Sequence, residues 1–358
     1  MPFHKDFKLQ GKSFSSKEEL INFSKKNLDV EVANFLQQWF DDSLFLEVKT
    51  SGSTGKPKVI KLQKNYMVNS AIATGNYFNL FENSTALLCM SSKYIAGKMM
   101  LVRALTLGWH IDIVEASLNP LKNCEKQYDF SAMVPMQLHN SLTELHKLKK
   151  LIVGGGVVSD TLLDKIQNVN TEIFATYGMT ETITHIAVKK LNNCHSKLVE
   201  KSYYKTLPNI TILTDSRGCL IINAPDIAKE KVITNDLVEL VSPIAFKWLG
   251  RFDTVINSGG VKLIPNQIEK KISKVITERF FVAGIKDEVL GEKLILVIEK
   301  LLTERSRTKK RILNSLKNLQ SLTKYEIPKE IYIIKNFVET ETKKINRIET
   351  LKMIKNID

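Results

Sequence analysis

A loop near the start of the chain, VKTSGSTGKPKVI at residues 48–60, combines glycines, small hydroxyl side chains and lysines. The glycines let backbone N–H groups approach an anion, the hydroxyls add donors, and the lysines add charge, so a polyphosphate suits this loop. The nucleotide-binding P-loop has four residues between its glycines, whereas two separate Gly52 and Gly55. The alternative is a flexible basic surface loop. The predicted phosphate-binding residues are Thr50, Ser51, Gly52, Ser53, Thr54, Gly55, Lys56 and Lys58.

A second segment, IFATYGMTET, places chemically useful residues directly after a predicted strand. The ring of Tyr177, next to Gly178, can stack on a base, and the hydroxyl of Thr180 can reach a phosphate. Glu181 offers a carboxylate that can hold Mg²⁺ against phosphate oxygens. The alternative role for Glu181 is that of a carboxylate near a helix N-terminus, where it interacts with the helix dipole.

Two further segments add candidates for binding the adenine and ribose of a nucleotide. LIVGGGV ends a predicted strand with Gly154, Gly155 and Gly156, which allow close backbone approach by a flat ligand. Asp236 and Arg251, the arginine of GRFD, suit ribose hydroxyls. The alternative is that these two side chains form a structural pair with each other.

In this combination and order, the motifs resemble those of the adenylate-forming superfamily of acyl-CoA synthetases, luciferases and peptide-synthetase adenylation domains. The loop at residues 50–58 is similar to its phosphate-binding signature, YGMTE to its adenine-and-magnesium signature, GRFD to its hinge, and KKINR to its catalytic-lysine signature. The resemblance extends from about residue 46 to residue 347. It implies that a carboxylic acid attacks the α-phosphate of MgATP to give an acyl-adenylate, and that the thiol of CoA then attacks the adenylate.

The resemblance also implies roles for single residues. Lys344 would stabilise the charge between the acid and the α-phosphate, Glu181 would hold Mg²⁺, and Asp253 would be the hinge of a rotating small domain. The chain departs from the superfamily in two ways, because the segment before the loop is short and Lys343 stands where relatives usually have glycine. A tunnel for the thiol would be bordered by Ser258, Gly259 and Gly260.

The segments YIAGKMMLVRAL and MVPMQL lie where members of the superfamily line the acid pocket. On a short chain they most resemble the o-succinylbenzoate–CoA ligases of menaquinone biosynthesis. That aromatic acid has a second carboxylate, which needs a cation or several donors in an apolar pocket, and Lys98 and Arg103 are the candidates. They fall about 140° apart on a helix, so we expect only one to face the pocket. The predicted pocket residues are Tyr94, Lys98, Arg103, Val134 and Gln137.

Three alternative functions stay open from the sequence. The chain could be another aryl- or acyl-CoA ligase, a ligase that loads a carrier protein, or a catalytically silent ATP- or nucleic-acid-binding protein. The formal charge of +14 favours anionic partners but does not separate the phosphates of CoA from an acidic carrier. The most basic segment, TERSRTKKRILNSLKNLQ, has apolar residues at helical spacing and no aromatic residues, which weakens the case for nucleic acid.

These candidate residues need elements to position them. From residue 44 onward, short apolar runs alternate with helical patterns, which predicts an α/β domain with a parallel sheet. After residue 203 hairpin-like runs follow, and beyond GRFD about a hundred residues have an α+β pattern. We therefore expect an N-terminally trimmed adenylate-forming fold, with a large domain over residues 1–252 and a small mobile domain over residues 253–358.

The composition bounds the environment of the protein. No apolar run approaches the ~20 residues of a membrane-spanning helix, and the first residues lack the apolar core of a signal peptide. We therefore expect a cytoplasmic enzyme without membrane insertion. The four cysteines are scattered, without a C-x-x-C pair, which indicates reduced thiols rather than a disulfide framework or a zinc site.

Overall fold

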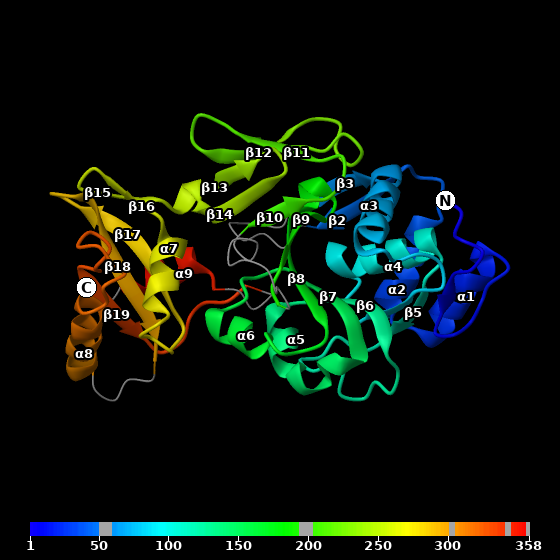
Figure 1. The fold of residues 1–358 in the computed structure, drawn as a ribbon, viewed down its shortest axis with the longest axis horizontal. Coiled ribbons are helices and arrows are strands. Elements are labelled where there is room, and N and C mark those ends of the chain that lie inside the picture. The colour runs from blue at the N-terminus through cyan, green and yellow to red at the C-terminus, as the bar shows by residue number, and fades with distance from the viewer. Residues whose placement is uncertain (50–58, 193–202, 301–304, 341–344, 356–358) are drawn as a thin grey trace.

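The computed structural model describes residues 1–49, 59–192, 203–300, 305–340 and 345–355. A large sheet with its helices occupies the N-terminal part, and a small sheet with its own helices occupies the C-terminal part (Figure 1). The expected fold class, a large α/β unit followed by a small α+β unit, is confirmed. The predicted phosphate loop at residues 50–58 and the pair Lys343 and Lys344 lie outside the described residues.

The large sheet has a parallel half and an antiparallel half. Parallel pairs join β1, β5, β4, β6, β7 and β8 in that order, and β9, β10, β14, β13, β12 and β11 then follow as antiparallel neighbours. The end of β8, which carries the YGMTE segment, therefore lies where the two halves meet. The strands are β1 (Lys8–Leu9), β4 (Thr85–Leu88), β5 (His110–Ile113), β6 (Tyr128–Met133), β7 (Leu148–Val153), β8 (Glu172–Gly178), β9 (His185–Lys190), β10 (Tyr204–Thr206), β11 (Thr211–Thr214), β12 (Cys219–Asn223), β13 (Val232–Ser242) and β14 (Ala245–Arg251).

The helices of the large unit include one that is buried along most of its length. α4 packs against α3, and its residues 97–105 are all buried, as expected for a helix that is apolar nearly all round. β2 and β3 form a separate antiparallel pair that leads directly into α3, so the apolar run at residues 44–48, where the pattern that predicts the parallel sheet begins, does not join that sheet. The elements are α1 (Lys17–Asn27), α2 (Val30–Trp39), β2 (Phe45–Lys49), β3 (Val59–Gln63), α3 (Lys64–Phe78), α4 (Ile95–Leu107), α5 (Pro135–Asn140), α6 (Asp160–Lys165) and short 3-10 turns at Leu142–Lys147 and Thr180–Thr182.

The small unit is organised around β18, which alternates between two cores. Leu294, Leu296 and Ile298 pack with residues of α7 and α8, whereas Ile295 and Val297 pack on the other face with α9. The strands run in the order β16-β15-β18-β17, and β19 pairs with β18 in parallel. The elements are a 3-10 turn (Phe252–Thr254), β15 (Ile256–Ser258), β16 (Val261–Leu263), α7 (Pro265–Ile272), β17 (Phe280–Asp287), β18 (Gly291–Glu299), α8 (Arg305–Lys317), β19 (Glu330–Ile334) and α9 (Arg347–Lys355).

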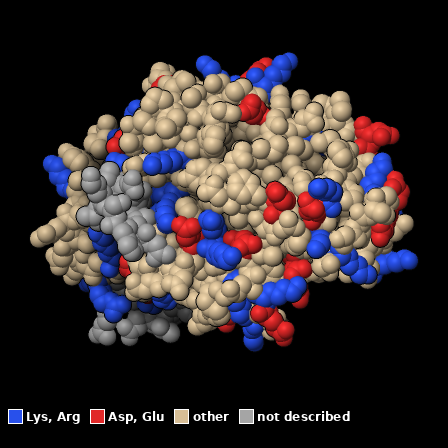
Figure 2. All heavy atoms as spheres, turned by 45° about the vertical axis from the view of Figure 1, so that its right-hand side comes forward, with Lys and Arg blue, Asp and Glu red and all other residues tan. Residues whose placement is uncertain are grey.

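The chain passes from the large sheet to the small sheet close to the expected domain boundary. The large sheet ends at Arg251 and the small sheet begins at Ile256, on either side of residues 252–253. That the two units are domains that move against each other stays a prediction. On the face shown in Figure 2, Lys and Arg side chains are scattered among Asp and Glu. None of the described helices is both long enough and apolar enough to cross a membrane.

Candidate active site

Three adjacent parallel strands bring several predicted site residues together at their carboxyl ends. β6 is followed by Val134, β7 by the glycine run, and β8 ends with Tyr177 and Gly178. Gly154 donates its backbone N–H to the carbonyl of Met133 at 3.1 Å. Gly155 has φ +76°, and a side chain there would contact Val134. The carboxyl ends of parallel strands are the usual place for a ligand in α/β sheets, so the sheet supports the predicted grouping.

A second group of predicted site residues, Tyr177 and Asp236, lies where the antiparallel half of the sheet adjoins β8. The hydroxyl of Tyr177 donates to Oδ2 of Asp236 at 2.6 Å, and the indole N–H of Trp248 donates to Oδ1 at 3.1 Å. Asp236 is buried, with 8% of its surface exposed, and both oxygens thus have partners. Burial, followed by the charge of Asp236, raises the pKa of Tyr177, so this phenol stays protonated and keeps donating. The side chains predicted to bind the nucleotide therefore already form hydrogen bonds with one another.

Arg251 has a different partner from the one that the sequence offered as an alternative. It stands opposite Asp236 in the β13–β14 register, but its guanidinium binds Asp253 through Nε at 2.9 Å and Nη2 at 2.7 Å. The hydrogen bonds from Arg251 lower the pKa of Asp253. The predicted ribose-binding arginine and the predicted hinge residue therefore form one ion pair.

The turn after β8 is tightly constrained. A side chain on Gly178 would lie 2.2 Å from the carbonyl oxygen of Thr184 and 2.5 Å from Cα of His185, so only glycine fits there. Thr182 bonds with its hydroxyl to backbone atoms of Met179 and Thr184. Ile183 has φ +64°, which is uncommon for a β-branched residue and marks local strain.

This turn presents Thr180 and Glu181 without using their side chains for its own structure. Glu181 is exposed and Thr180 is half-buried. Within the described ranges, Glu181 forms no ion pair, and no cluster of three or more His, Cys, Asp or Glu side chains suited to a metal occurs. One free carboxylate fits Mg²⁺, because that ion keeps several waters and takes most other ligands from substrate phosphates.

Two of the predicted acid-pocket residues contribute to structure around α5. Gln137 donates its amide to the carbonyls of Cys89 at 2.8 Å and Ser117 at 3.0 Å, and its oxygen accepts from the backbone N–H of Val134 at 3.3 Å. Gln137 therefore fixes the start of α5, where Val134 lies partly exposed beside the glycine run. Tyr94 is the residue before α4 and is half-buried.

The two candidate cations on α4 point in different directions. Lys98 lies over the ring of Phe35 on α2, with its Nζ 5.3 Å from the ring centroid, and burial lowers its pKa while Glu31 partly opposes the change. Arg103 instead contacts Thr74 on α3 and His185 on β9. The opposite placement follows from their five-residue spacing on a helix.

Arg103 is buried without a carboxylate partner among the described residues, and its exposed fraction is 1%. Its contacts are long: Nε to Oγ1 of Thr74 at 3.3 Å, Nη2 to Nδ1 of His185 at 3.5 Å and Nη1 to the sulfur of Met100 at 3.7 Å. Burial lowers the pKa of Arg103 to about 9, so the group is still charged at neutral pH. A buried charge is unfavourable unless it is paired, and no carboxylate among the described residues serves as a counterion for Arg103.

The sequence patterns gave no indication of His185. It is 4% exposed, and in the β8–β9 register it stands directly opposite Gly178. Only its position just after YGMTET could have suggested a role, and no spacing rule marks it.

The predicted thiol-tunnel residues and the residues that follow the predicted lysine, from residue 345 onward, lie in the small unit. Ser258 is the last residue of β15, and Gly259 and Gly260, with φ +58° and +80°, form the turn to β16. Two contacts fix the residues that follow the predicted lysine. The backbone N–H of Asn346 donates to the carbonyl of Val338 at 2.7 Å. Arg347 binds both carboxylate oxygens of Glu269 at 2.9 Å.

Comparison with known proteins finds one family model and many similar chains. The family described as "AMP-binding enzyme" matches residues 11–219, more than half of the chain. A 2-succinylbenzoate–CoA ligase from Geobacillus sp. (strain WCH70) is 24% identical over 364 residues, covering 92% of this chain and 73% of that ligase.

Solved structures give the same result for the fold. An acyl-CoA synthetase (AMP-forming)/AMP-acid ligase II-like protein from Dyadobacter fermentans is 35% identical, with 95% of this chain and 99% of that chain covered and a TM-score of 0.61. The O-succinylbenzoate coenzyme A synthetase of Bacillus subtilis, in complex with ATP and magnesium ion, is 20% identical, covers 85% of this chain and 69% of its own, and has a TM-score of 0.72.

Proposed function

Because the chain belongs to the AMP-binding enzyme family and is an acid–CoA ligase of the adenylate-forming type, we propose that its acid carries a second carboxylate and that o-succinylbenzoate is the best candidate. The observation that carries this proposal is Arg103, a buried guanidinium without a carboxylate partner in the described part of the chain. A second carboxylate on the substrate would supply the missing counterion. The similarity to 2-succinylbenzoate–CoA ligases supports the same choice.

In the first half-reaction, a carboxylate oxygen of the acid attacks the α-phosphorus of ATP, and the bond to pyrophosphate breaks. The loop at residues 50–58 would hold the leaving pyrophosphate, and Lys344 would stabilise the charge on the acid and the α-phosphate. Glu181 would hold Mg²⁺, which neutralises phosphate charge when it is bound. The relative from B. subtilis, solved with ATP and magnesium, supports the use of both.

The nucleotide would lie along the end of β8. Tyr177 and Gly178 border the adenine site together with the glycine run, and Asp236 accepts ribose hydroxyls through the lone pairs that Tyr177 and Trp248 leave free. Arg251 approaches the ribose from the adjoining strand while it stays paired with Asp253. A change in the position of Asp253 would therefore be transmitted to the ribose site.

In the second half-reaction, the sulfur of CoA attacks the acyl carbon, the bond to AMP breaks, and the thiol proton leaves. We propose that the small unit rotates about Asp253 between the two steps, so that Ser258, Gly259 and Gly260 border the thiol path. Both glycines have positive φ, a backbone conformation that residues with a side chain rarely adopt, so we expect only glycine at these two positions of the turn.

The test is CoA-dependent release of pyrophosphate from ATP with a panel of acids: o-succinylbenzoate, benzoate, a medium-chain fatty acid and no acid. We expect strong turnover with o-succinylbenzoate alone. Equal turnover with benzoate would refute the requirement for a second carboxylate. If the acid were adenylated but no CoA thioester formed, we would infer that a carrier protein, and not CoA, accepts the acyl group.

A further inference from the structure

An ion pair in the small unit ties the chain just after the predicted catalytic lysine to α7. The guanidinium of Arg347 binds the carboxylate of Glu269 through both terminal nitrogens, Nη1 to Oε1 at 2.9 Å and Nη2 to Oε2 at 2.9 Å. It also lies over the ring of Phe281, 5.5 Å from the centroid. The side chains of Arg347 and Glu269 are 34% and 16% exposed. A two-point contact between partly buried groups fixes their orientation as well as their distance.

Glu269 is itself held firmly in the small unit. Ile268 and Ile272, on the same helix, are buried in the core between α7 and β18. Oε1 of Glu269 also accepts the backbone N–H of Val282 at 3.0 Å. β17, which carries Val282, is an outer strand of the small sheet, so the carboxylate takes the place of a neighbouring strand there. Glu269 is therefore an anchor within the fold and not a freely moving surface carboxylate.

Further contacts join the chain on either side of residues 341–344. Glu339 and Ile345 form an antiparallel bridge, and the backbone N–H of Val338 donates to Oγ1 of Thr350 at 3.1 Å. Lys344 directly precedes Ile345 in the sequence. Consecutive Cα atoms are about 3.8 Å apart, so an anchor on the residues that follow Lys344 limits where its main chain can lie.

The other end of this path reaches the large unit. A side chain on Gly250 would lie 2.7 Å from Cγ2 of Ile264 and 3.0 Å from Oδ1 of Asn266. The start of α7 is therefore in direct contact with β14, next to Arg251. Through Glu269 and α7, the segment after the predicted lysine is connected to the strand that carries a predicted ribose-binding residue.

We infer that the Glu269–Arg347 ion pair positions Lys344 against the nucleotide, so that Glu269 and Arg347 are positioning residues for the adenylation step. The inference rests on the proposed function, because the role of Lys344 is itself part of that proposal. In that proposal Lys344 acts on the acid and the α-phosphate, whereas the turn at residues 258–260 serves the thiol. Loosening the pair should therefore impair the first half-reaction and leave the second intact.

The first test measures the two half-reactions separately. Pyrophosphate exchange reports adenylation with the acid of the panel that is turned over fastest, and thioester formation from its preformed adenylate and CoA reports the second step. For Glu269→Gln and Arg347→Met we expect kcat of adenylation to fall roughly 10- to 100-fold, as for a reacting group displaced by about 1 Å. The KM for ATP and the rate of thioester formation should stay unchanged. Arg347→Lys, which keeps the charge but loses the two-point contact, should have an intermediate rate.

A matched control lies on the same helix. Lys271 on α7 binds both carboxylate oxygens of Glu326 at 2.6 Å and 2.7 Å, but Glu326 belongs to the segment before β19 and not to the one after Lys344. Glu326→Gln should therefore leave both half-reactions unchanged. If the variants of the Glu269–Arg347 pair lost both half-reactions equally, the pair would have only a structural role and the inference would be wrong.

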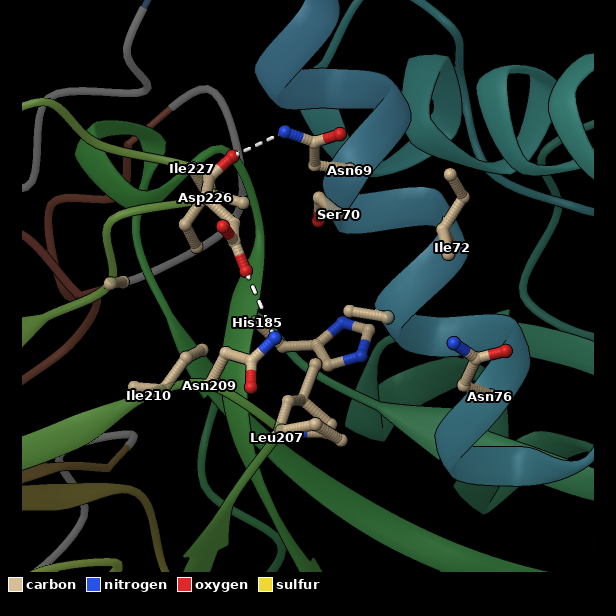
Figure 3. A pocket seen from close by; sticks show the side chains of 13 residues that line it. Asn69, Ser70, Ile72, Asn76, His185, Leu207, Asn209, Ile210, Asp226 and Ile227 are labelled. Atoms are coloured by element: carbon tan, nitrogen blue, oxygen red, sulfur yellow. Dashed lines mark hydrogen bonds between the residues drawn. The ribbon is translucent and has the colours of Figure 1, made fainter.

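A second control lies in the large unit, at the pocket beside α3 that His185 and Ser70 also line (Figure 3). There the side-chain amide of Asn209 donates to Asp226 at 3.2 Å. Asn209 has φ +61°, which glycine adopts without strain. Asn209→Gly removes a hydrogen bond remote from α7, and the ratio of the two half-reactions should stay unchanged.

Another measurement does not depend on turnover. The backbone N–H groups of Asn346 and Thr350 donate to the carbonyls of Val338 at 2.7 Å and of Asn346 at 3.0 Å. In Arg347→Met these two amides should exchange with deuterium roughly 10-fold faster than in the wild type, because local opening becomes easier. Glu326→Gln should not change their exchange. Unchanged exchange in Arg347→Met would overturn the anchoring role whatever the acid substrate.

Lys344→Ala separates this inference from the proposed function. If Lys344→Ala abolished adenylation while Glu269→Gln and Arg347→Met retained it, the inference would be wrong and the proposed function would stand. If Lys344→Ala retained adenylation, or if no acid of the panel were adenylated, the proposed function would fail, and with it the step that the pair is inferred to serve.

Discussion

The nucleotide side and the acid side of the candidate site differ in how their buried polar groups are satisfied. On the nucleotide side, Asp236 already accepts from Tyr177 and Trp248, and Arg251 is paired with Asp253. On the acid side, Arg103 has only long contacts, and atoms of His185 and Ser70 lack partners among the described residues. A pre-bonded region is rigid before its ligand arrives, whereas an unsatisfied region gains most of its stabilisation from the ligand.

The largest expected effect concerns neither binding region but the chemistry between them. Lys344→Ala should lower the rate of adenylation by about 100-fold or more, because one preorganised charge at the reacting atoms is lost. Binding of ATP and of the acid should change little. Pyrophosphate exchange and calorimetric titration with ATP would measure the two quantities.

Lys343→Ala is the control for this prediction. It should retain most of the adenylation activity, because Lys344 is the residue that aligns with the catalytic-lysine signature. Equal losses in both variants would contradict the assignment, and a parallel loss of ATP binding would indicate a structural role.

The next effect tests the pre-bonded side. Asp236→Ala would leave the Tyr177 hydroxyl and the Trp248 indole N–H without their acceptor, so we expect the free energy of unfolding to fall by about 1–3 kcal/mol, together with a loss of ATP affinity. Urea unfolding and ATP titration would measure both. Tyr177→Phe removes one donor and leaves the carboxylate paired with Trp248, so its effect should be smaller.

The unsatisfied side should respond in the opposite way. Arg103→Met replaces a buried, unpaired charge with an apolar chain, so stability should be unchanged or higher. The preference for o-succinylbenzoate over benzoate should fall roughly 10- to 100-fold. The control is Lys98→Met, which removes a cation that faces α2 and should leave the preference intact. Destabilisation by Arg103→Met would mean that the fold itself supplies a counterion.

The smallest effect is a pH dependence. Because burial lowers the pKa of His185, the folded state stays neutral there while the unfolded state gains a proton below about pH 6.5. Stability should therefore fall as the pH drops from 7 to 5, by at most about 2 kcal/mol from this residue. His185→Gln should flatten the curve, and the exposed His139→Gln should not. Identical pH curves for the wild type and His185→Gln would show that His185 takes up its proton over the same pH range in the folded and unfolded states.

The sequence predicted the elements better than the contacts. The strand and helix patterns from residue 85 onward correspond to elements of the structure, because apolar periodicity is a local signal. The Arg251–Asp253 pair was not predicted, because the sequence suggested Asp236 as the partner of Arg251. Gln137 was expected to line a pocket, but its amide holds two carbonyls of other segments.

His185 and Ser70 show why the rest could not be predicted. Neither residue lies in a recognisable spacing. Their shared property is a buried side-chain atom without a partner among the described residues, and it depends on which segments α3 and β9 meet in space. Arg103 was noticed from its motif, but only the three-dimensional structure shows that no carboxylate of the described residues pairs with it. Binding roles for all these residues stay predictions.

The Tyr177–Asp236 hydrogen bond joins residues 59 positions apart in the chain. In the sheet, β9, β10 and β14 lie between β8, which carries Tyr177, and β13, which carries Asp236. Contacts of such long sequence separation form late in folding, because their loop-closure entropy must be overcome first. We therefore expect a refolding chain to recover its helical signal before it can bind ATP, and a ribosome-bound chain to lack a nucleotide site until β13 and β14 have emerged.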